Sequence, residues 1–335
     1  MTKIAINGFG RIGRNTFKIL LDKSEVHIVG LNDLSSTTVL ANELKYDSIY
    51  GVYHKNIRAT EHSLFIDDKE IPVFAEKDPS KLPWKNLDVD IVLECTGRFT
   101  SGEKAKAHLD AGAKKVIISA PAKDEGITPT YLIGVNAEEY KGEKIISCAS
   151  CTTNCITPIS KILQKRLGIE KMMMTTVHSY TAEQSIVDTS PPGEHANDLR
   201  RARSGSTNII PTSTGAAIST TQVIPELKGK FDGLSLRVPT PIVSISDFTI
   251  LLSQPTTREK LNSILKEECD KNPAILGYTT DPVVSSDLKG DPRSAIIDLS
   301  LTNVVDGNLA KIVAWYDNEF GYSNRLAELA LVISK

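Results

Sequence analysis

The sequence predicts an α/β protein in which a doubly wound, parallel-sheet domain is followed by an α+β domain with a mixed, largely antiparallel sheet. Three observations predict it. Short apolar runs alternate with helical periodicity over residues 1–150, as in parallel sheets covered by helices on both faces. A glycine-rich turn directly follows the first apolar run. After residue 151, strand-like runs dominate and several alternate apolar and polar residues, which is typical of antiparallel strands with one buried face.

In chain order, we expect strands of the first domain at 3–7, 26–32, 90–94, 115–119 and 144–148, with helices at 12–21 and 103–111. In the second domain we expect a helix through 161–167 and strands at 172–178, 234–238, 244–252, 295–301 and 309–316. The three consecutive methionines at 172–174 are interpreted as core packing of a strand. Residues 187–208 contain Pro-Pro-Gly and predict a long irregular loop, a type that is often functional.

Length and composition exclude several classes of protein. With 335 residues, 40% hydrophobic and 24% charged, the chain reads as an ordinary globular protein of about two domains. The net charge of −2 supplies no global field for nucleic acid or an anionic membrane. Five cysteines, three of them crowded at 148–155, do not resemble a disulfide framework. The chain shows neither a signal-peptide pattern nor an apolar stretch of roughly 20 residues, so we expect a cytoplasmic protein.

The glycine-rich turn follows the G-x-G-x-x-G pattern with Gly8, Gly10 and Gly13, between an expected strand and an expected helix. Such glycines allow a tight turn, close approach of the backbone to a pyrophosphate, and close packing of helix on strand. Asp33 ends the second expected strand, where a carboxylate can hold the adenine ribose hydroxyls and repel a 2′-phosphate. The glycines alone would indicate only a turn. Together with the flanking strand and helix and with Asp33, they predict a Rossmann domain that binds NAD in preference to NADP.

The segment 147–155, Ser-Cys-Ala-Ser-Cys-Thr-Thr-Asn-Cys, joins a strand to a helix. The thiolate of Cys151 at the helix N-terminus would be stabilised by the helix dipole, as a nucleophile requires, whereas Cys155 lies inside the helix. Two core cysteines are the alternative, and a metal pair is a poor one because no second Cys/His pair has ligand spacing. His178 ends an expected strand, but spacing cannot place it beside Cys151.

The chain resembles the phosphorylating glyceraldehyde-3-phosphate dehydrogenases in five segments that occur in the same order along nearly its whole length. They are Ile-Asn-Gly-Phe-Gly-Arg-Ile-Gly-Arg at 6–14, Ala-Ser-Cys-Thr-Thr-Asn-Cys at 149–155, the segment around His178, Thr-Ser-Thr-Gly-Ala-Ala at 212–217 and Trp-Tyr-Asp-Asn-Glu-Phe-Gly-Tyr at 315–322. The run at 149–155 is nearly diagnostic.

The resemblance implies a reaction in two halves. A Cys151 thiolate paired with His178 attacks the aldehyde of glyceraldehyde 3-phosphate to give a hemithioacetal. His178 then takes the hydroxyl proton as hydride leaves for NAD, and the product is a thioester. Inorganic phosphate attacks the thioester and releases the acyl phosphate, 1,3-bisphosphoglycerate. Covalent catalysis of this kind keeps the oxidation energy from being lost to water.

The resemblance also assigns the remaining site residues. Besides the three glycines, those implied to contact NAD are Arg11, Ile12, Asp33, Lys77, Ser119, Asn318 and Tyr322. Those implied to bind phosphate groups are Ser150, Thr152, Thr214 and Gly215 at one anion site and Thr181, Arg201 and Arg237 at the other. Taken alone, the basic run 200–203 would indicate a solvated face, and the threonines would be strand or capping residues. No metal ligand is expected.

The same resemblance implies the domain organisation and the oligomeric state, and two alternative functions are weighed against it. It implies a homotetramer, an NAD-binding domain at 1–150, a catalytic domain at 151–317, and a C-terminal helix at 318–335 that packs back on the first domain. The sequence departs from the family in a longer stretch between Gln184 and Arg200 and in Ala182-Glu183, where Asn-Asp is more usual. Erythrose-4-phosphate dehydrogenase is one alternative, disfavoured by Tyr180-Thr181 and by residues 214–216. A non-catalytic Rossmann binding protein is the other, disfavoured by the intact cysteine and histidine.

Overall fold

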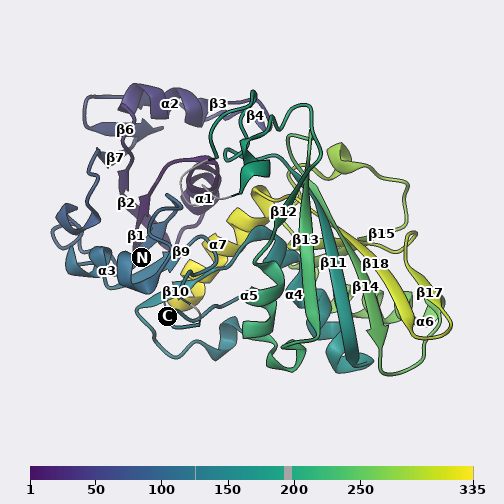
Figure 1. The fold of residues 1–335 in the computed structure, drawn as a ribbon. Coiled ribbons are helices and arrows are strands. Elements are labelled where there is room, and N and C mark those ends of the chain that lie inside the picture. Colours follow the sequence, from purple (N-terminus) through teal and green to yellow (C-terminus); the bar gives the residue numbers. More distant parts are fainter. Residues whose placement is uncertain (125, 192–197, 335) are drawn as a thin grey trace. The chain divides into compact units, whose positions relative to one another are not determined.

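The computed structural model describes residues 1–124, 126–191 and 198–334 (Figure 1). They form two compact units, Met1–Ser150 with Ser323–Lys335, and Cys151–Tyr322. Within the described ranges, no helix combines the length and the apolar character needed to cross a bilayer.

The first unit is built on a sheet in the order β10-β9-β8-β1-β2-β7-β6-β5. Its strands are β1 (Thr2–Asn7), β2 (Val26–Asn32), β5 (Ile57–Ala59), β6 (Ser63–Ile66), β7 (Lys69–Phe74), β8 (Ile91–Glu94), β9 (Lys115–Ile118) and β10 (Ile145–Ser147). The strands from β10 to β7 are parallel, and β6 and β5 continue the sheet antiparallel. A small ribbon of β3 (Tyr46–Asp47) and β4 (Gly51–Val52) lies apart from it.

Helices of the first unit pack on this sheet through apolar faces. They are α1 (Arg11–Leu21), α2 (Thr37–Lys45), α3 (Gly102–Asp110) and the later part of α7 (Phe320–Ile333). Phe17 and Leu20 of α1 are fully buried, which fixes the face that α1 turns to β1 and β2. The ammonium of Lys115 in β9 donates to the carbonyl of Ile333. This bond joins α7 to the first sheet.

The second unit has a mixed sheet in the order β12-β13-β11-β14-β18-β16-β15, with β17 paired to β18. Its strands are β11 (Ile169–Ser179), β12 (Ile210–Ser213), β13 (Phe231–Val238), β14 (Ser244–Leu252), β15 (Leu276–Thr279), β16 (Ala295–Asp298), β17 (Asn303–Val305) and β18 (Leu309–Tyr316). Only the pairs β11–β13 and β15–β16 are parallel among those described. The helices are α4 (Cys151–Arg166), α5 (Ala216–Val223) and α6 (Arg258–Lys271).

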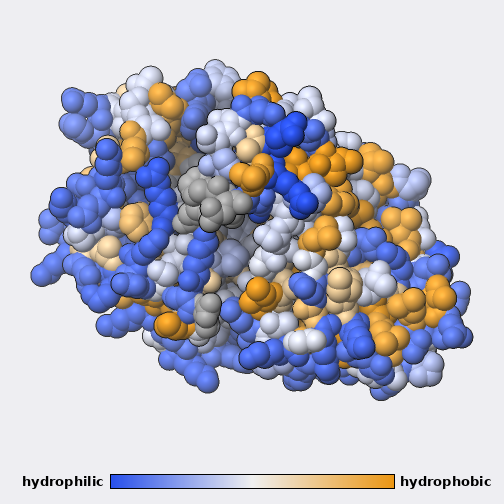
Figure 2. Space-filling model, viewed as in Figure 1, coloured by the Kyte–Doolittle hydropathy of each residue, from blue (hydrophilic) through white to orange (hydrophobic). Residues whose placement is uncertain are grey.

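One face of the second sheet is covered by helices and the other is not. Helix α4 contacts β11, β14, β16 and β18. On β11, Met172 and Met174 are 2% exposed, whereas Met173 between them is 60% exposed, because successive side chains of a strand point to opposite faces. The interpretation of all three methionines as core is therefore wrong for Met173. Figure 2 shows apolar side chains interspersed with polar ones over the second unit.

The α/β class is confirmed, and the expected strands and helices are present with small shifts at their ends. The strand expected at 295–301 is the exception, because it already ends at Asp298. The short strands β3 to β7 and the helices α2, α5 and α6 were not predicted from the sequence. The expected loop at 187–208 includes a 3-10 turn, Leu199–Ala202, and its residues 192–197 lie outside the described part of the chain.

Candidate active site

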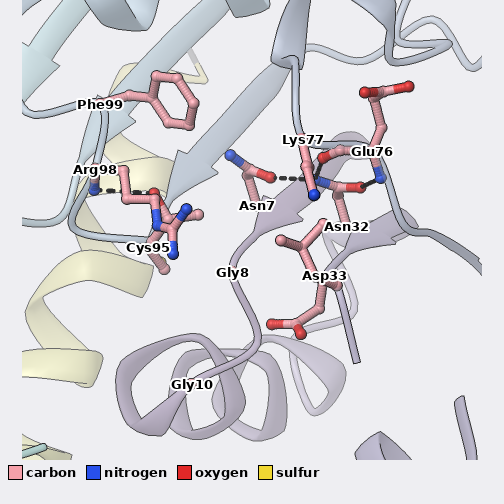
Figure 3. Close-up of a pocket in the computed structure, with 12 residues that line it drawn as sticks. Asn7, Gly8, Gly10, Asn32, Asp33, Glu76, Lys77, Cys95, Arg98 and Phe99 are labelled. Atoms are coloured by element: carbon pink, nitrogen blue, oxygen red, sulfur yellow. Dashed lines mark hydrogen bonds between the residues drawn. The ribbon is translucent and has the colours of Figure 1, made fainter. Parts of the chain in front are cut away.

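A cavity of about 320 Å³ opens at the carboxyl ends of β1, β2 and β8 in the first unit (Figure 3). This is the edge of a parallel sheet where ligands of open α/β folds bind. The cavity brings together Gly8, Gly10, Asp33 and Lys77 among the residues singled out from the sequence. It is also lined by Asn7, Asn32, Leu34, Glu76, Cys95, Thr96, Arg98 and Phe99.

The three glycines meet the steric demands of a dinucleotide-binding turn. Gly8 has a φ of +92°, and a Cβ there would lie 2.7 Å from the backbone nitrogen of Thr96. A Cβ on Gly13 would lie 2.1 Å from the carbonyl oxygen of Gly8, so the helix can approach the turn only without one. A Cβ on Gly10 would meet nothing within 4 Å. The turn therefore leaves open space at the start of α1, where a pyrophosphate would meet free N–H groups.

The carboxylate of Asp33 is fixed beside this turn. Its Oδ2 accepts a hydrogen bond from the backbone N–H of Phe9 at 2.9 Å, and its Oδ1 accepts one from Ser35 at 2.9 Å. Each oxygen has a second lone pair that these bonds do not use. Figure 3 shows the carboxylate close to the turn at Gly8 and Gly10, and this position suits bonds to ribose hydroxyls.

A buried polar network, which the sequence did not reveal, supports the floor of the cavity. The amide of Asn7 donates to Glu94 at 2.5 Å, and Asn32 donates to the Asn7 oxygen at 2.6 Å. Glu94 also accepts from the backbone of Thr96 at 2.8 Å. His108 donates to Glu94 from Nε2, at 2.9 Å, because its Nδ1 accepts from the indole of Trp84. A fully bonded network of this kind rigidifies its surroundings.

The other residues expected to contact NAD differ in their burial and in their contacts. The side chain of Arg11 pairs with Asp47 at 2.6 Å, and its backbone lies at the start of α1. Ile12 and Gly13 follow it in the first turn of α1. Ser119 hydrogen-bonds the thiol of Cys95, which lines the cavity. Asn318 and Tyr322 are buried in the second unit.

In the second unit, Cys151 is the first residue of α4, and its Sγ lies 3.5 Å from Nε2 of His178 near the end of β11. The sequence could not show this proximity. His178 is 3% exposed, and its ring packs edge-on against Tyr316 with centroids 6.0 Å apart. The hydroxyl of Tyr316 bonds Thr152 at 2.9 Å and Thr176 at 2.8 Å. Tyr316 thus ties the start of α4 to β11, a role that sequence reasoning missed.

Hydrogen bonding selects the tautomer of His178. Its Nδ1 lies 2.7 Å from the carbonyl oxygen of Ser179, which can only accept. Nδ1 therefore carries the hydrogen, and Nε2 presents a lone pair to the Cys151 thiol. Nη1 of Arg237 lies 3.1 Å from the same Nδ1 and donates to the Ser179 carbonyl at 3.3 Å; because both nitrogens carry hydrogen, the carbonyl is the acceptor that they share. A neutral imidazole in this tautomer is a proton acceptor facing a thiol.

Burial disfavours the charged form of both reacting groups. It raises the pKa of the Cys151 thiol, although Arg237, the Thr152 hydroxyl and the backbone N–H groups act in the opposite direction. Burial and then Arg237 lower the pKa of His178 to about 3. Burial thus favours a thiol beside a neutral imidazole, whereas Arg237 and the hydrogen bonds at the start of α4 favour the thiolate of Cys151. The helix N-terminus acts as predicted, but desolvation outweighs it.

Cys155 differs from Cys151 in burial and in partner. Its side chain is fully buried, and burial raises the pKa of its thiol. The groups that act on its pKa besides burial are Ser246 and Cys151, and neither is a base. An inert structural thiol is the appropriate description of Cys155.

Hydrogen bonds through the backbone of Ser179 and the hydroxyl of Ser244 connect His178 to Asn318. The backbone N–H of Ser179 donates to the hydroxyl of Ser244 at 3.1 Å, and that hydroxyl donates to the Asn318 side chain at 3.0 Å. The hydroxyl of Ser179 donates to the carbonyl of Val243 at 2.8 Å. Val243 has a φ of +67°, which is strained for a β-branched residue and is common at functional sites.

The residues expected at one phosphate site lie close together. Arg237 Nη1 approaches the Thr181 hydroxyl at 3.4 Å. Arg201 and Arg237 both pair with the carboxylate of Glu183. Arg201 is also bonded through Nε to Asp198 at 3.1 Å. Glu183 stands out in the sequence only as a departure from the family pattern, so its place between the arginines was not foreseen.

The residues expected at the other anion site are spread over two helix starts. Thr152 is in the first turn of α4. The hydroxyl of Thr214 accepts from the backbone of Ala216 at 3.2 Å, and Gly215 caps α5. Ser150 immediately precedes α4 in the chain. Hydroxyls and N–H groups at helix starts are suitable donors to a phosphate.

Comparisons with known proteins identify the family. Residues 2–102 match the family model described as "Glyceraldehyde 3-phosphate dehydrogenase, NAD binding domain", and residues 150–318 match "Glyceraldehyde 3-phosphate dehydrogenase, C-terminal domain". The chain belongs to the glyceraldehyde-3-phosphate dehydrogenase family. Its NAD-binding part holds the glycine turn and Asp33, and its C-terminal part holds Cys151 and His178.

Curated members of the family are similar over their whole length. The chain is 50% identical to glyceraldehyde-3-phosphate dehydrogenase of Zymomonas mobilis over 338 residues, covering 99% of this chain and 98% of the relative. It is 48% identical to glyceraldehyde-3-phosphate dehydrogenase 1 of Bacillus cereus, with 98% of both chains covered. It is also 48% identical to the enzyme of Geobacillus stearothermophilus, covering 99% of this chain and 98% of the relative.

Across the described ranges, no three His, Cys, Asp or Glu side chains gather closely enough to hold a metal ion. The groups in place at the site are a thiol, an imidazole, hydroxyls and guanidinium groups, which suit covalent catalysis on a phosphorylated substrate.

Proposed function

We propose that the protein oxidises D-glyceraldehyde 3-phosphate with NAD and inorganic phosphate to 1,3-bisphosphoglycerate, as an enzyme of glycolysis and gluconeogenesis. The observation that carries the proposal is the Cys151 thiol 3.5 Å from the unprotonated nitrogen of His178. Full-length similarity to enzymes of that name supports the substrate and the cofactor.

In the first step His178 acts as a general base. Its Nε2 accepts the thiol proton while the sulfur of Cys151 bonds to the aldehyde carbon. Nε2 then passes this proton to the carbonyl oxygen, so the hemithioacetal forms and Nε2 is again free to accept a proton. The Ser179 carbonyl keeps Nδ1 protonated throughout, so Nε2 is the nitrogen that moves the proton. Starting from a neutral pair, the proton transfer and the S–C bond formation proceed together.

In the second step the hemithioacetal becomes a thioester. The hydroxyl proton passes to Nε2 of His178 as the C–H bond breaks with both its electrons, and the carbonyl re-forms. When bound, NAD supplies the acceptor for that hydride. Asp33, Lys77, Ser119, Tyr322 and the turn at residues 8–13 would hold the cofactor, and Asn318 would hold the carboxamide of its nicotinamide.

In the third step inorganic phosphate attacks the thioester carbon. The S–C bond breaks, the Cys151 sulfur leaves, and the acyl phosphate is released. Ser150, Thr152, Thr214 and Gly215 would bind the attacking phosphate. Thr181, Arg201 and Arg237 would bind the phosphate of the substrate, for which guanidinium forks are well suited.

We further infer a homotetramer in the cytoplasm, without a membrane partner or a dedicated nucleic-acid site. Apolar side chains left exposed in the second unit, such as Met173 and Ile209 at 60% and 67% exposure, support assembly. The domains proposed are 1–150 for NAD, 151–317 for catalysis, and a C-terminal helix at 318–335 that packs back on the first. The compact units Met1–Ser150 with Ser323–Lys335, and Cys151–Tyr322, support this division.

Steady-state NADH formation from glyceraldehyde 3-phosphate tests the proposal, measured with and without inorganic phosphate. We expect sustained turnover only when phosphate is present. Turnover that is independent of phosphate, or the absence of NADH formation, would contradict it.

A further inference from the structure

We propose that Glu183 is an internal counter-anion of the substrate-phosphate site, which the substrate must displace, and that it selects doubly charged phosphate esters over singly charged anions. This inference rests on the proposed function, because it assigns Arg201 and Arg237 to the substrate phosphate. It adds a specificity-determining residue to that site.

The carboxylate of Glu183 lies between the two arginines. Its Oε1 is 3.4 Å from Nη2 of Arg237, and its Oε2 bonds Nη1 of Arg201. The arginine side chains are 13% and 5% exposed, and the Glu183 side chain is 31% exposed. Glu183 is therefore the most accessible of the three and the one that can move toward solvent when an anion enters.

Several other donors of the two arginines are directed to groups of the protein. Arg201 uses Nε for Asp198 and approaches the carbonyl of Ser213 at 3.5 Å through Nη2. Arg237 uses Nη1 for the Ser179 carbonyl and the Thr181 hydroxyl. The groups that remain for a substrate phosphate are thus Nη1 of Arg201 and Nη2 of Arg237, which Glu183 occupies, together with Nε of Arg237.

Unsatisfied donors in the same place indicate that a further acceptor belongs there. Within the described residues, Nε of Arg237 is buried without a hydrogen-bond partner. Nε2 of Gln184 is in the same situation, although the oxygen of that amide accepts from Thr181. A buried donor without a partner carries a desolvation cost, and a phosphate with several acceptor oxygens can remove it where one carboxylate does not.

The charges explain the selectivity. Arg201 and Arg237 carry two positive charges, and Glu183 and Asp198 carry two negative charges, so the cluster is formally neutral. A singly charged anion that replaces the carboxylate brings the same charge to the two arginines, so the exchange contributes little binding free energy. A phosphate dianion brings twice the charge and more acceptor oxygens, so it can displace Glu183 with a net gain.

The Glu183→Gln variant tests the role directly, because it removes the charge and keeps the shape. We expect the KM for glyceraldehyde 3-phosphate to fall by about tenfold, which corresponds to about 1.4 kcal/mol, with kcat changed less than twofold. For glyceraldehyde without a phosphate, kcat/KM should stay as in the parent. Asp188→Asn is the matched control, since Asp188 pairs with exposed Arg203 in the same segment, and it should alter none of these values.

Calorimetric binding of glycerol 3-phosphate separates this inference from the proposed function, because it needs no turnover. Glu183→Gln should bind it about tenfold more tightly, with D-glycerate affected much less. Glu183→Asp keeps the charge on a shorter side chain and should be intermediate. Weaker or unchanged glycerol 3-phosphate binding by Glu183→Gln would overturn the inference, since Glu183 would then only hold the arginines in place. If Glu183→Gln does not fold, unchanged binding by Glu183→Asp would overturn it equally.

Discussion

Nδ1 of His178 lies 2.7 Å from the carbonyl oxygen of Ser179, and this contact determines which ring nitrogen faces Cys151. Because a carbonyl oxygen can only accept, the hydrogen stays on Nδ1 and the lone pair stays on Nε2. Burial keeps the ring neutral by lowering its pKa to about 3. His178 therefore presents the lone pair of Nε2 to the Cys151 thiol at neutral pH.

Replacing His178 with Asn should slow the chemical step by roughly 10²–10⁴-fold, the usual contribution of a positioned general base. The variant should also react more slowly with iodoacetamide at neutral pH, because the Cys151 thiol loses the acceptor that draws off its proton. Single-turnover kinetics and alkylation rates measure the two effects. Alkylation at the parent's rate would mean that the two side chains do not interact.

The free energy of unfolding should depend on pH because the pKa of His178 is lowered in the folded protein. Its pKa is lowered to about 3 in the folded protein, so between about pH 3 and 6.5 the unfolded state binds more protons. The stability that a neutral, buried His178 contributes is fully present above about pH 6.5 and is lost as the pH falls toward 3. At pH 5 this loss amounts to about 2 kcal/mol.

Urea unfolding at pH 7.5 and pH 5 measures this loss. His178→Asn should lose less stability than the parent on acidification, because its side chain does not titrate. His62→Asn, at a side chain that is 81% exposed, is the control and should follow the parent. Equal acid losses in the parent and in His178→Asn would contradict the burial account.

Substitution of the two cysteines of α4 should have different effects on dehydrogenase activity. Cys151→Ser should abolish nearly all dehydrogenase activity and leave NAD binding largely intact, because an alcohol provides no usable anion near neutral pH. Cys155→Ser should keep substantial activity, since Cys155 is fully buried and burial raises the pKa of its thiol. Steady-state rates measure the activity of each variant, and NAD titrations measure its cofactor binding. The reverse pattern would mean that the nucleophile is wrongly assigned.

Asp33 should determine the choice of coenzyme. A 2′-phosphate would bring nearly two charges close to its carboxylate, and such a contact can cost several kcal/mol. NAD should therefore be preferred by at least ~100-fold in kcat/KM, and Asp33→Gly should narrow the gap mainly by improving NADP. Kinetics with both coenzymes test this. Comparable efficiencies in the parent enzyme would refute it.

Local features of the sequence predicted local features of the structure well. The turn at Gly8 to Gly13 and the start of α4 at Cys151 depend on neighbouring residues, and both were predicted. The short strands β5 and β6 and helix α6 were missed. Three- and four-residue strands give too little periodicity to recognise, and α6 is mostly polar, with its buried residues confined to Leu261, Ile264, Leu265 and Cys269.

Contacts between distant residues could not be predicted from spacing. His178 lies 27 residues after Cys151, and only the antiparallel and parallel pairings of β11 bring its end to the start of α4. Tyr316 and Glu183 lie in segments that the sequence marks as distinctive, but their roles were not predicted because they depend on partners far along the chain. The protonation of the catalytic pair also required the structure, since the extent of burial decides it.

The covalent intermediate tests the central claim most directly. Mixing the enzyme with glyceraldehyde 3-phosphate and NAD, but without phosphate, should produce a burst of about one NADH per active site. Mass spectrometry of the acid-quenched protein should then locate an acyl group on the peptide that contains Cys151, and added phosphate should remove it. A burst without an acyl group on Cys151, or an acyl group on another cysteine, would contradict the account.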